Sequence, residues 1–427
     1  MKDYLKTLPR QIREIIRQAS SCAWQSRLKV YLVGGFVRDA LLGVPNLDLD
    51  IVVEGDGIAF ADKLSRVLKA RVVRHRRFGT ATLHCPPRLK VDVATIRREY
   101  YPQPGHLPVV EPGVLKEDLF RRDFTINAMA IDITRQGYGN VIDFFGGKED
   151  LRRGIVRVLH EVSFLDDPTR IMRAVRFEQR YRFRIERKTL RLLREAVELD
   201  MLSRVDAQRI RDDLVLMLKE SCPPRALGRL YRLAGFSFLS PSLGFGTNTR
   251  ELLGRIGKQL AWFEDTYAER RRVENWLVYF MGITGALDDA ALARMMRSLG
   301  LRKQDEKRAL DVRKLLADKR LCGLRRKDVR PSVIYRLFEP HSYEALLFVK
   351  AVYKDRWIHR HIEDFFEIYN GMRISISGHD VHALGMKPGP VYQKIFSRVL
   401  HAKLDGKVTT RDEENALIRK IVRNLIK

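Results

Sequence analysis

Residues 30–53 read VYLVGGFVRDALLGVPNLDLDIVV, and this stretch decides the fold of the first part of the chain. Its opening apolar run predicts a buried strand. The Gly34-Gly35 pair that follows allows a sharp turn and a close approach of the backbone to a ligand. A short helix with Arg38 and a loop rich in turn formers then lead to a second strand, which we expect to begin at Leu47.

Two carboxylates stand on that second strand. Asp48 and Asp50 are two residues apart, so they project from the same face of the strand. Adjacent carboxylates repel one another unless a cation lies between them, and Mg²⁺ is the hard cation that takes one or two carboxylates together with phosphates. Gly35 and Arg38 are then available to hold a triphosphate. The combination favours metal-assisted phosphoryl or nucleotidyl transfer over a solvated strand face beside an ordinary turn.

GGFVRDALLG followed by LDLDIVV resembles the bacterial tRNA nucleotidyltransferases and their poly(A) polymerase relatives, within the polymerase-β-like nucleotidyltransferase superfamily. The resemblance runs from about residue 30 to about residue 218 and then fades into a helical region. It implies an α+β chain, with a nucleotidyltransferase head built on a mixed sheet with helices. An all-helical neck that recognises the base and an RNA-binding helical body and tail would follow. We place these four domains at residues 1–150, 151–222, 223–370 and 371–427.

The same resemblance assigns roles to two later segments. KVDVATI at 90–96 alternates as a strand does, and Asp92 on it is the candidate third catalytic carboxylate and general base. RRDFTIN at 121–127 matches the family's second motif, which contacts the nucleotide and its ribose, so Arg122, Asp123 and Asn127 are expected to bind nucleotide. A salt-bridged helix start explains any one of these residues, but not the whole matching run.

SFLDDPTRIMRAVRFEQRYRF at 163–183 places an arginine at every third position of one predicted helix. A stripe of this kind is more often a solvated face. Here it begins with an Asp-x-x-Arg pair, as the family's base-reading motif does, although the family usually has Glu-Asp where this chain has Asp166-Asp167. The resemblance implies that Asp167 and Arg170 read the base edge, supported by Arg173 and Arg176. Further along, the sequence predicts that Arg209 and Asp213, one helical turn apart, pair and brace the neck.

Composition points to a polyanionic partner. Lys and Arg number 80 against 53 Asp and Glu, a net charge of +27 spread along the whole chain. This favours tRNA over a local membrane patch. No apolar run approaches the roughly 20 residues of a membrane span, and the charged N-terminal segment lacks a signal-peptide core. The four cysteines form no Cys-x-x-Cys pair. We therefore expect a cytoplasmic protein with no membrane partner.

Two other site types are weaker candidates. Gly-Gly-Lys at 146–148 is followed by Glu149 rather than Ser or Thr, which excludes a P-loop. His379-Asp380 and His382 raise the alternative of an HD-type metal phosphohydrolase, but the further spaced ligands that it needs are not evident. Residues 387–390, Lys-Pro-Gly-Pro ahead of an amphipathic helix, favour instead a helix N-terminus that faces backbone phosphate.

The sequence thus predicts a template-independent tRNA nucleotidyltransferase with Mg²⁺ as cofactor. It would add the terminal A, or the whole CCA, from ATP, or from ATP and CTP, and release pyrophosphate. One alternative is a poly(A) polymerase acting on other RNA 3′ ends, against which FGTATL at 78–83 and PGHLPVV at 104–110 argue. The other is a non-catalytic RNA-binding protein of the same fold, against which the intact Asp48, Asp50 and Arg122 argue.

Overall fold

The computed structural model describes residues 4–86, 89–106, 108–267, 269 and 272–426. The chain divides into two compact units, residues 1–238 and 239–427. All strands of the structure belong to the first unit, which carries every residue expected to take part in catalysis or nucleotide binding. The four domain boundaries expected from the sequence subdivide these two units and stay a prediction.

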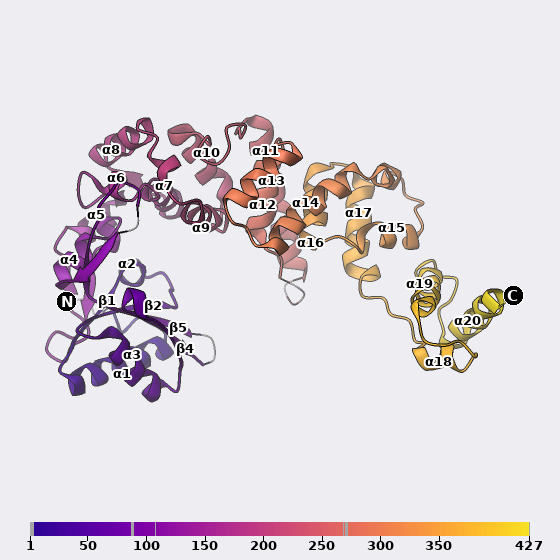
Figure 1. Ribbon diagram of the computed structural model, residues 1–427, viewed down its shortest axis with the longest axis horizontal. Coiled ribbons are helices and arrows are strands. Elements are labelled where there is room, and N and C mark those ends of the chain that lie inside the picture. The colour runs from indigo at the N-terminus through magenta and orange to yellow at the C-terminus, as the bar shows by residue number, and fades with distance from the viewer. Residues whose placement is uncertain (1–3, 87–88, 107, 268, 270–271, 427) are drawn as a thin grey trace. The chain divides into compact units, whose positions relative to one another are not determined.

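A seven-stranded mixed sheet forms the centre of the first unit (Figure 1). Its strand order is β3-β4-β5-β2-β1-β8-β9, and only β2 and β5 run parallel among its neighbours. The strands are β1 Lys29–Val33, β2 Asp48–Glu54, β3 Arg71–His75, β4 Thr80–Cys85, β5 Leu89–Thr95, β8 Ala130–Asp132 and β9 Val141–Ile142. The predicted α+β fold with a mixed sheet is confirmed.

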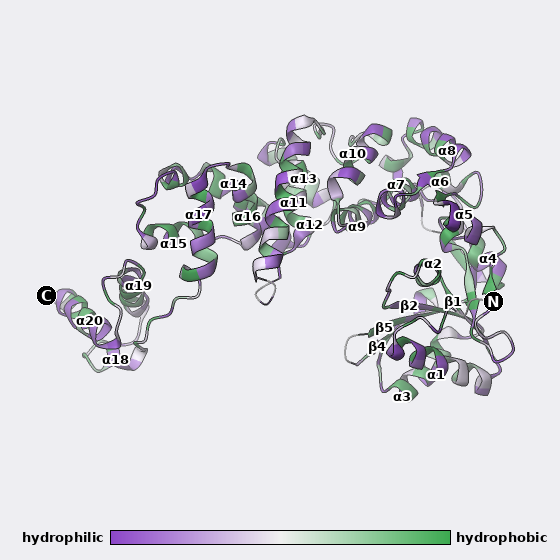
Figure 2. Cartoon of the chain, turned by 180° about the vertical axis from the view of Figure 1, so that it is seen from behind, coloured by the Kyte–Doolittle hydropathy of each residue, from purple (hydrophilic) through white to green (hydrophobic). Residues whose placement is uncertain are grey.

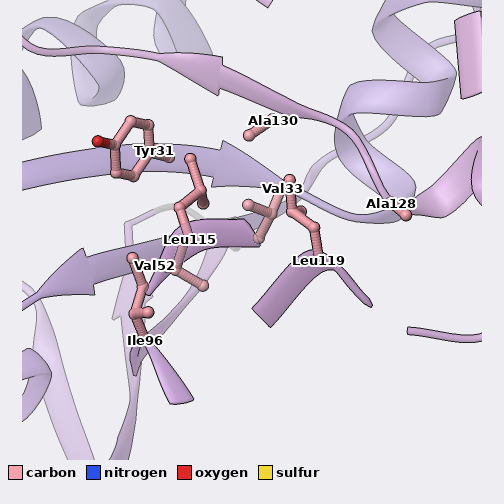
Figure 3. Close-up of a cluster of buried hydrophobic side chains, with 8 residues drawn as sticks. All are labelled: Tyr31, Val33, Val52, Ile96, Leu115, Leu119, Ala128 and Ala130. Carbon is pink, nitrogen blue, oxygen red and sulfur yellow. The ribbon is translucent and has the colours of Figure 1, made fainter. Parts of the chain in front are cut away.

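Helices cover both faces of this sheet. α1 (Arg10–Ser26) and α3 (Gly57–Leu68) pack together on one face (Figure 1). α4 (Leu115–Phe120) covers the other, where Leu115 and Leu119 enter a core with Tyr31, Val33 and Val52 (Figure 3). Because alternate residues of a strand face opposite sides, burial of both faces explains the almost unbroken apolar run of β1. The next helix after β1 is α2, Gly35–Leu42.

The remainder of the first unit is mainly helical. A separate hairpin of β6 (Arg97–Tyr100) and β7 (Val109–Pro112) precedes α4. Short β10 (Ile155–Val156) and β11 (Arg184–Ile185) pair in parallel. The helices are α5 Gly147–Arg153, α6 Ser163–Asp166, α7 Arg170–Tyr181, α8 Arg187–Glu198, α9 Ala207–Leu218 and α10 Pro223–Ala234. The Gly-Gly-Lys segment begins α5, where Asp143 accepts hydrogen bonds from the backbone N–H groups of Gly147 and Lys148, both 2.9 Å, so its role is structural.

Every regular element described in the second unit is a helix, as the sequence predicts. Hydrophobic and hydrophilic residues share the same helices (Figure 2), as amphipathic packing requires. The core includes an aromatic cluster of Trp262, Phe263, Tyr267 and Phe366. The helices are α11 Thr247–Tyr267, α12 Asn275–Thr284, α13 Asp289–Ser298, α14 Lys303–Ala317, α15 Pro331–Phe338, α16 Tyr343–Val352, α17 Arg356–Asp364, α18 Gly378–His382, α19 Pro390–Leu404 and α20 Arg411–Ile426.

Within the described part of the chain, the helices are all too short or too polar to cross a membrane. The cytoplasmic location itself stays a prediction. The last three helices have an apolar core of their own, which contains Val381, Ile395 and Val399. All four cysteines are free thiols.

Candidate active site

The pairing of β2 with β5 brings the three predicted carboxylates to one end of the sheet. In this parallel register Asp50 lies opposite Asp92, and Asp48 lies opposite Lys90. The carboxylates of Asp50 and Asp92 line a cavity of about 440 Å³, together with Lys90, Arg121 and Arg122. The sequence places Asp48 and Asp50 together by strand periodicity, and the fold adds Asp92 from 42 residues further along the chain.

Asp50 is the carboxylate whose charge is least well solvated. Burial, opposed by Arg122 and assisted by the neighbouring Asp92 and Asp48, raises the pKa of Asp50 to about 6. A cation at this position would remove that penalty, because it favours the ionised form of both neighbouring acids. Two carboxylates open to a cavity are a donor set that fits a hard divalent ion shared with substrate phosphates.

Asp92 is held differently. Its Oδ1 accepts a hydrogen bond of 2.6 Å from Thr82 Oγ1, and its Oδ2 lies 2.6 Å from Lys90 Nζ. The hydrogen bond to Asp92 raises the pKa of Lys90 against the effect of its partial burial. Among the described residues no group of three His, Cys, Asp or Glu side chains is arranged to hold a metal ion. Asp48 and Asp50 therefore remain the expected metal ligands, and both oxygens of Asp92 are already engaged.

Gly34 leaves space for the side chain of Arg122 beside the carboxylates. Its φ is +71°, in the left-handed region, and a Cβ there would lie 2.9 Å from Arg122 Nη1 and 3.3 Å from Asp50 Oδ2. Any side chain would push Arg122 away from the carboxylates. The sequence assigned Gly34 to the close approach of a ligand. In the structure it first leaves space for the side chains of Arg122 and Asp50. Gly35 begins α2, where a Cβ would lie 3.4 Å from Arg38 Nη2.

A buried aspartate that sequence reasoning missed positions both arginines of the Arg-Arg-Asp motif. Asp118 is fully buried and bonds Arg121 Nη2 at 2.7 Å and Arg122 Nη2 at 2.9 Å. Arg121 also reaches Glu99 at 3.0 Å. The two arginines outweigh the effect of burial and lower the pKa of Asp118. The signal was present in the sequence, since an acid three and four residues before two arginines faces both on a helix.

Arg38 is directed inward rather than toward the cavity. Its side chain is 5% exposed, donates to Asn127 Oδ1 at 2.6 Å and pairs with Asp39 at 2.8 Å. Its guanidinium also lies over the rings of Tyr181 and Phe177 on α7, 4.8 and 5.2 Å from their centroids. The structure therefore shows Arg38 joining α2 to α7, and the contact with a triphosphate stays a prediction.

Asn127 and Asp123 continue this connection. Asn127 Nδ2 donates to Asp123 Oδ1 at 2.9 Å, and Asp123 Oδ2 lies 3.8 Å from Arg173 Nη1. The second motif is thus tied to α7 through its own polar side chains. These groups are the ones expected to meet the nucleotide and ribose, and the structure places them between the carboxylate cavity and the arginines of α7.

Asp167 and Arg170, the predicted base-reading pair, are close together but buried. Arg170 Nε lies 3.9 Å from Asp167 Oδ2, and the same guanidinium donates to Ser163 Oγ at 2.5 Å and to the Arg121 carbonyl at 2.8 Å. Burial would raise the pKa of Asp167, but Arg173 and its other cationic neighbours lower it overall. Asp167 is therefore ionised at neutral pH and can only accept hydrogen bonds.

Arg173 is the centre of the neighbouring ion-pair network. It lies 2.8 Å from Asp167 and 3.4 Å from Asp213, and these carboxylates raise its pKa against the effect of burial. Arg209 bonds Asp167 at 2.7 Å. The predicted Arg209–Asp213 pair is therefore wrong, since each residue finds its partner on a different element instead.

Arg176 lies at the edge of this network. It is 3.5 Å from Glu220, and its guanidinium stacks 4.9 Å from the ring of Phe177. Burial lowers its pKa. Arg176 lies on α7 in the series of arginines that the sequence predicts. The acids near it come from α9 and from the residues that follow α9.

Asp380 of the HD-type alternative has a structural partner, as do His359 and His361, two other histidines of the second unit. Asp380 accepts from Ser377 in a capping box at the start of α18. His361 Nε2 lies 2.9 Å from the carbonyl of Arg326, and His359 Nε2 lies 2.6 Å from the carbonyl of Tyr353. Nothing in the described second unit supports a phosphohydrolase site.

Comparison with known proteins agrees with this geometry. A family model described as the poly(A) polymerase head domain matches residues 30–157. The chain is 32% identical over 96% of its length to the A-adding tRNA nucleotidyltransferase of Halalkalibacterium halodurans, of which it covers 92%. It is 40% identical over 95% of its length to the A-adding tRNA nucleotidyltransferase of Geobacter sulfurreducens, and spans about half, 47%, of that longer protein.

A solved CCA-adding enzyme in an apo form has the same fold, with a TM-score of 0.76 and 33% identity over 98% of this chain and 97% of that one. The carboxylate-bearing sheet and the matching head model define a nucleotidyltransferase. The chain belongs to the tRNA nucleotidyltransferase family, as its motifs predicted.

The buried Asp118 gives a first prediction. Asp118→Asn removes the charge that holds Arg121 and Arg122, and breaking a buried ion pair costs about 3 kcal/mol. We expect this loss in the free energy of unfolding, measured by urea denaturation. Glu149→Gln, which removes the solvent-exposed pair with Arg152, is the matched control and should change nothing measurable. Equal stabilities of the two variants would contradict the positioning role of Asp118.

The raised pKa of Asp50 gives a second prediction. The folded protein keeps a proton on Asp50 that the unfolded chain has released, so Asp50 makes stability fall as pH rises from about 4 to about 6. Asp50→Asn removes this dependence. Its stability relative to wild type should therefore rise by roughly 1–2 kcal/mol between about pH 4 and pH 7.

The measurement is urea denaturation with a chelator present, because a bound cation would keep Asp50 ionised. Asp62→Asn on α3 is the control. A difference between Asp50→Asn and wild type that is constant with pH would refute the assignment.

Proposed function

We propose that this chain is a template-independent nucleotidyltransferase that adds AMP from ATP to the 3′ end of tRNA and releases pyrophosphate. The observation that carries the proposal is the meeting of Asp48, Asp50 and Asp92 at one end of β2 and β5, with Arg122 beside Asp50. The A-adding activity of the two relatives supports adenosine as the added nucleotide. Addition of the whole CCA, with CTP as a second substrate, is the alternative.

The proposed metal is Mg²⁺, held by Asp48 and Asp50. When bound, it would polarise the attacking ribose hydroxyl and neutralise charge on the phosphates. Arg122 and Lys90 line the same cavity and supply two further positive charges for the triphosphate. Gly35 places the N-terminus of α2 close by. Asp92, oriented by Thr82 and Lys90, is the group proposed to accept the proton of the hydroxyl.

The basic surface explains how RNA would be retained. A net charge of +27 remains after every Asp and Glu is counted against a Lys or Arg, and phosphate contacts by Lys and Arg supply most of the non-specific affinity for RNA. Binding of tRNA should therefore be separable from chemistry. Residues of the carboxylate cluster would carry the reaction, while the distributed basic residues would carry RNA affinity.

The test uses tRNAs that end before CCA, after C and after CC, each with labelled ATP or CTP. We expect AMP addition to the tRNA that ends in CC. Asp48→Asn should lower the rate by at least about a hundredfold, because the charge that stabilises the transition state is lost. Filter binding of tRNA should be unchanged, since Asp48 is exposed at the strand start and lies outside the basic surface.

Asp62→Asn is the matched aspartate control and should keep full activity. Addition by Asp48→Asn within tenfold of wild type would exclude this metal site. Extension of unrelated RNA as readily as tRNA would identify a poly(A) polymerase, and binding without any addition would identify a non-catalytic RNA-binding protein.

We further propose that Asp167 and Arg170, supported by Arg173 and Arg176, select the base. A hydrogen-bond acceptor beside a donor matches the amino group and the ring nitrogen that adenine and cytosine both present. Guanine and uracil would instead set acceptor against acceptor and donor against donor. The ionised Asp167 and the position of Arg170 beside it, 3.9 Å away, support this assignment. Asp167 now accepts from Thr169, Arg173 and Arg209, and Arg170 donates to Ser163 and to the Arg121 carbonyl, so each would have to free one hydrogen-bonding position for the base.

Asp167→Ala should therefore lower kcat/KM for ATP and raise the relative use of GTP and UTP by about one power of ten, since an unpaired polar group costs roughly 1–3 kcal/mol. All four triphosphates are measured on the same tRNA. Arg209→Ala removes another partner of Asp167 and controls for simple loss of structure. A parallel fall of all four values would leave Asp167 with a structural role only.

A further inference from the structure

A second cavity, of about 890 Å³, lies in the same unit but at the other end of the sheet. Its floor is the start of β1 and the end of β8, where Tyr31 pairs with Asp132. Lys29 at this end pairs with Glu54 at the far end of β2, six residues beyond Asp48. At about 3.3 Å per residue, this separates Lys29 in the cavity from Asp48 by roughly 20 Å and from Asp50 by roughly 13 Å along the sheet. It is therefore distinct from the proposed active site.

One wall of this cavity is formed by an exposed tryptophan, Trp24, whose ring contacts an arginine. Trp24, near the end of α1, is 55% exposed, and the guanidinium of Arg135 lies 4.8 Å from the centre of its ring. A cation–π contact of this kind fixes the orientation of the ring. Figure 3 shows Tyr31 beside the core with its hydroxyl pointing away from the other labelled side chains. That hydroxyl donates to Glu54 at 3.3 Å, so the floor is polar at this end.

The charges around the tryptophan are mainly positive. Arg27, Lys29 and Arg135 line the cavity, and Asp132 is the acid that lines it with them. Lys29 pairs with Glu54 at 3.1 Å. For Arg27 and Arg135, both exposed, no carboxylate of the described chain lies within ion-pair distance. An exposed aromatic ring beside two cations without an acidic partner offers a stacking surface and positive charge for one ligand that has both a flat ring and an anionic group.

We propose that this cavity binds a nucleoside phosphate. The base would stack on Trp24, Arg27 and Arg135 would contact the phosphate, and Asp132 would accept a hydrogen bond from an amino or hydroxyl group. Aromatic stacking combined with basic side chains is how single-stranded nucleic acids are held without sequence preference, and the volume is in the range of small-ligand sites. The same chemistry is offered by a free nucleotide and by one nucleotide of an RNA strand.

The test is photocrosslinking with two probes, azido-AMP and a short unstructured RNA that carries one thiouridine. Crosslinked peptides are mapped by mass spectrometry. We expect crosslinks within residues 23–31 or 132–137. In Trp24→Ala the yield there should fall at least about fivefold, the loss expected for one stacked base. Arg135→Ala should lower it as well. Crosslinks with azido-AMP alone identify free nucleotide as the ligand, and crosslinks with RNA alone identify a strand.

Matched controls are Phe144→Ala, an exposed aromatic outside the cavity, and Arg153→Ala, an exposed arginine outside it. Both should keep the wild-type yield. All variants should retain AMP addition at saturating ATP and tRNA, which separates this site from the proposed catalytic function and shows that they fold. Absence of crosslinks in these two segments, or equal yields in Trp24→Ala and Phe144→Ala, would overturn the proposal.

Discussion

The electrostatic attraction between Arg122 and Asp50 is the interaction on which the rest of the site depends. Three carboxylates at one strand end repel one another, and burial of Asp50 increases the cost. Arg122 offsets part of it, but only because Gly34 leaves room and Asp118 holds the guanidinium from behind. The head is thus built so that an incompletely neutralised acidic cluster stays open to a cavity, which is what a metal-dependent transferase requires.

A second constraint is the burial of arginines between the sheet and the helices after it. Arg38, Arg170 and Arg173 are too costly to bury alone, so each is paired with a carboxylate or a polar side chain. Through Asn127 and Asp123 these pairs form a continuous path from α2 to α7. The path fixes the expected nucleotide-binding side chains relative to the carboxylates. A network of this kind fixes the orientation of its side chains more than it increases the stability of the fold. The cost of removing the charges from water cancels much of the attraction between them.

The second unit follows a different principle. Its helices pack through ordinary apolar and aromatic contacts, and the deeply buried Lys350 is paired with Glu363 at 2.8 Å and lies over the ring of Trp262. Burial lowers the pKa of this lysine despite its partner. Among the residues of this unit that the structure describes, no group of three His, Cys, Asp or Glu side chains is arranged to hold a metal ion.

The sequence alone determined the features that depend on local spacing. Strand periodicity placed Asp48 and Asp50 on one face, the apolar run defined β1, and the motif around Arg122 identified the family. Tertiary structure decided which side chains meet. The parallel register put Asp92 opposite Asp50, packing turned Arg38 inward, and Arg209 bonded Asp167 instead of Asp213. These outcomes depend on contacts between elements distant in the chain, and a buried charge takes whichever partner the packing of those elements brings within reach.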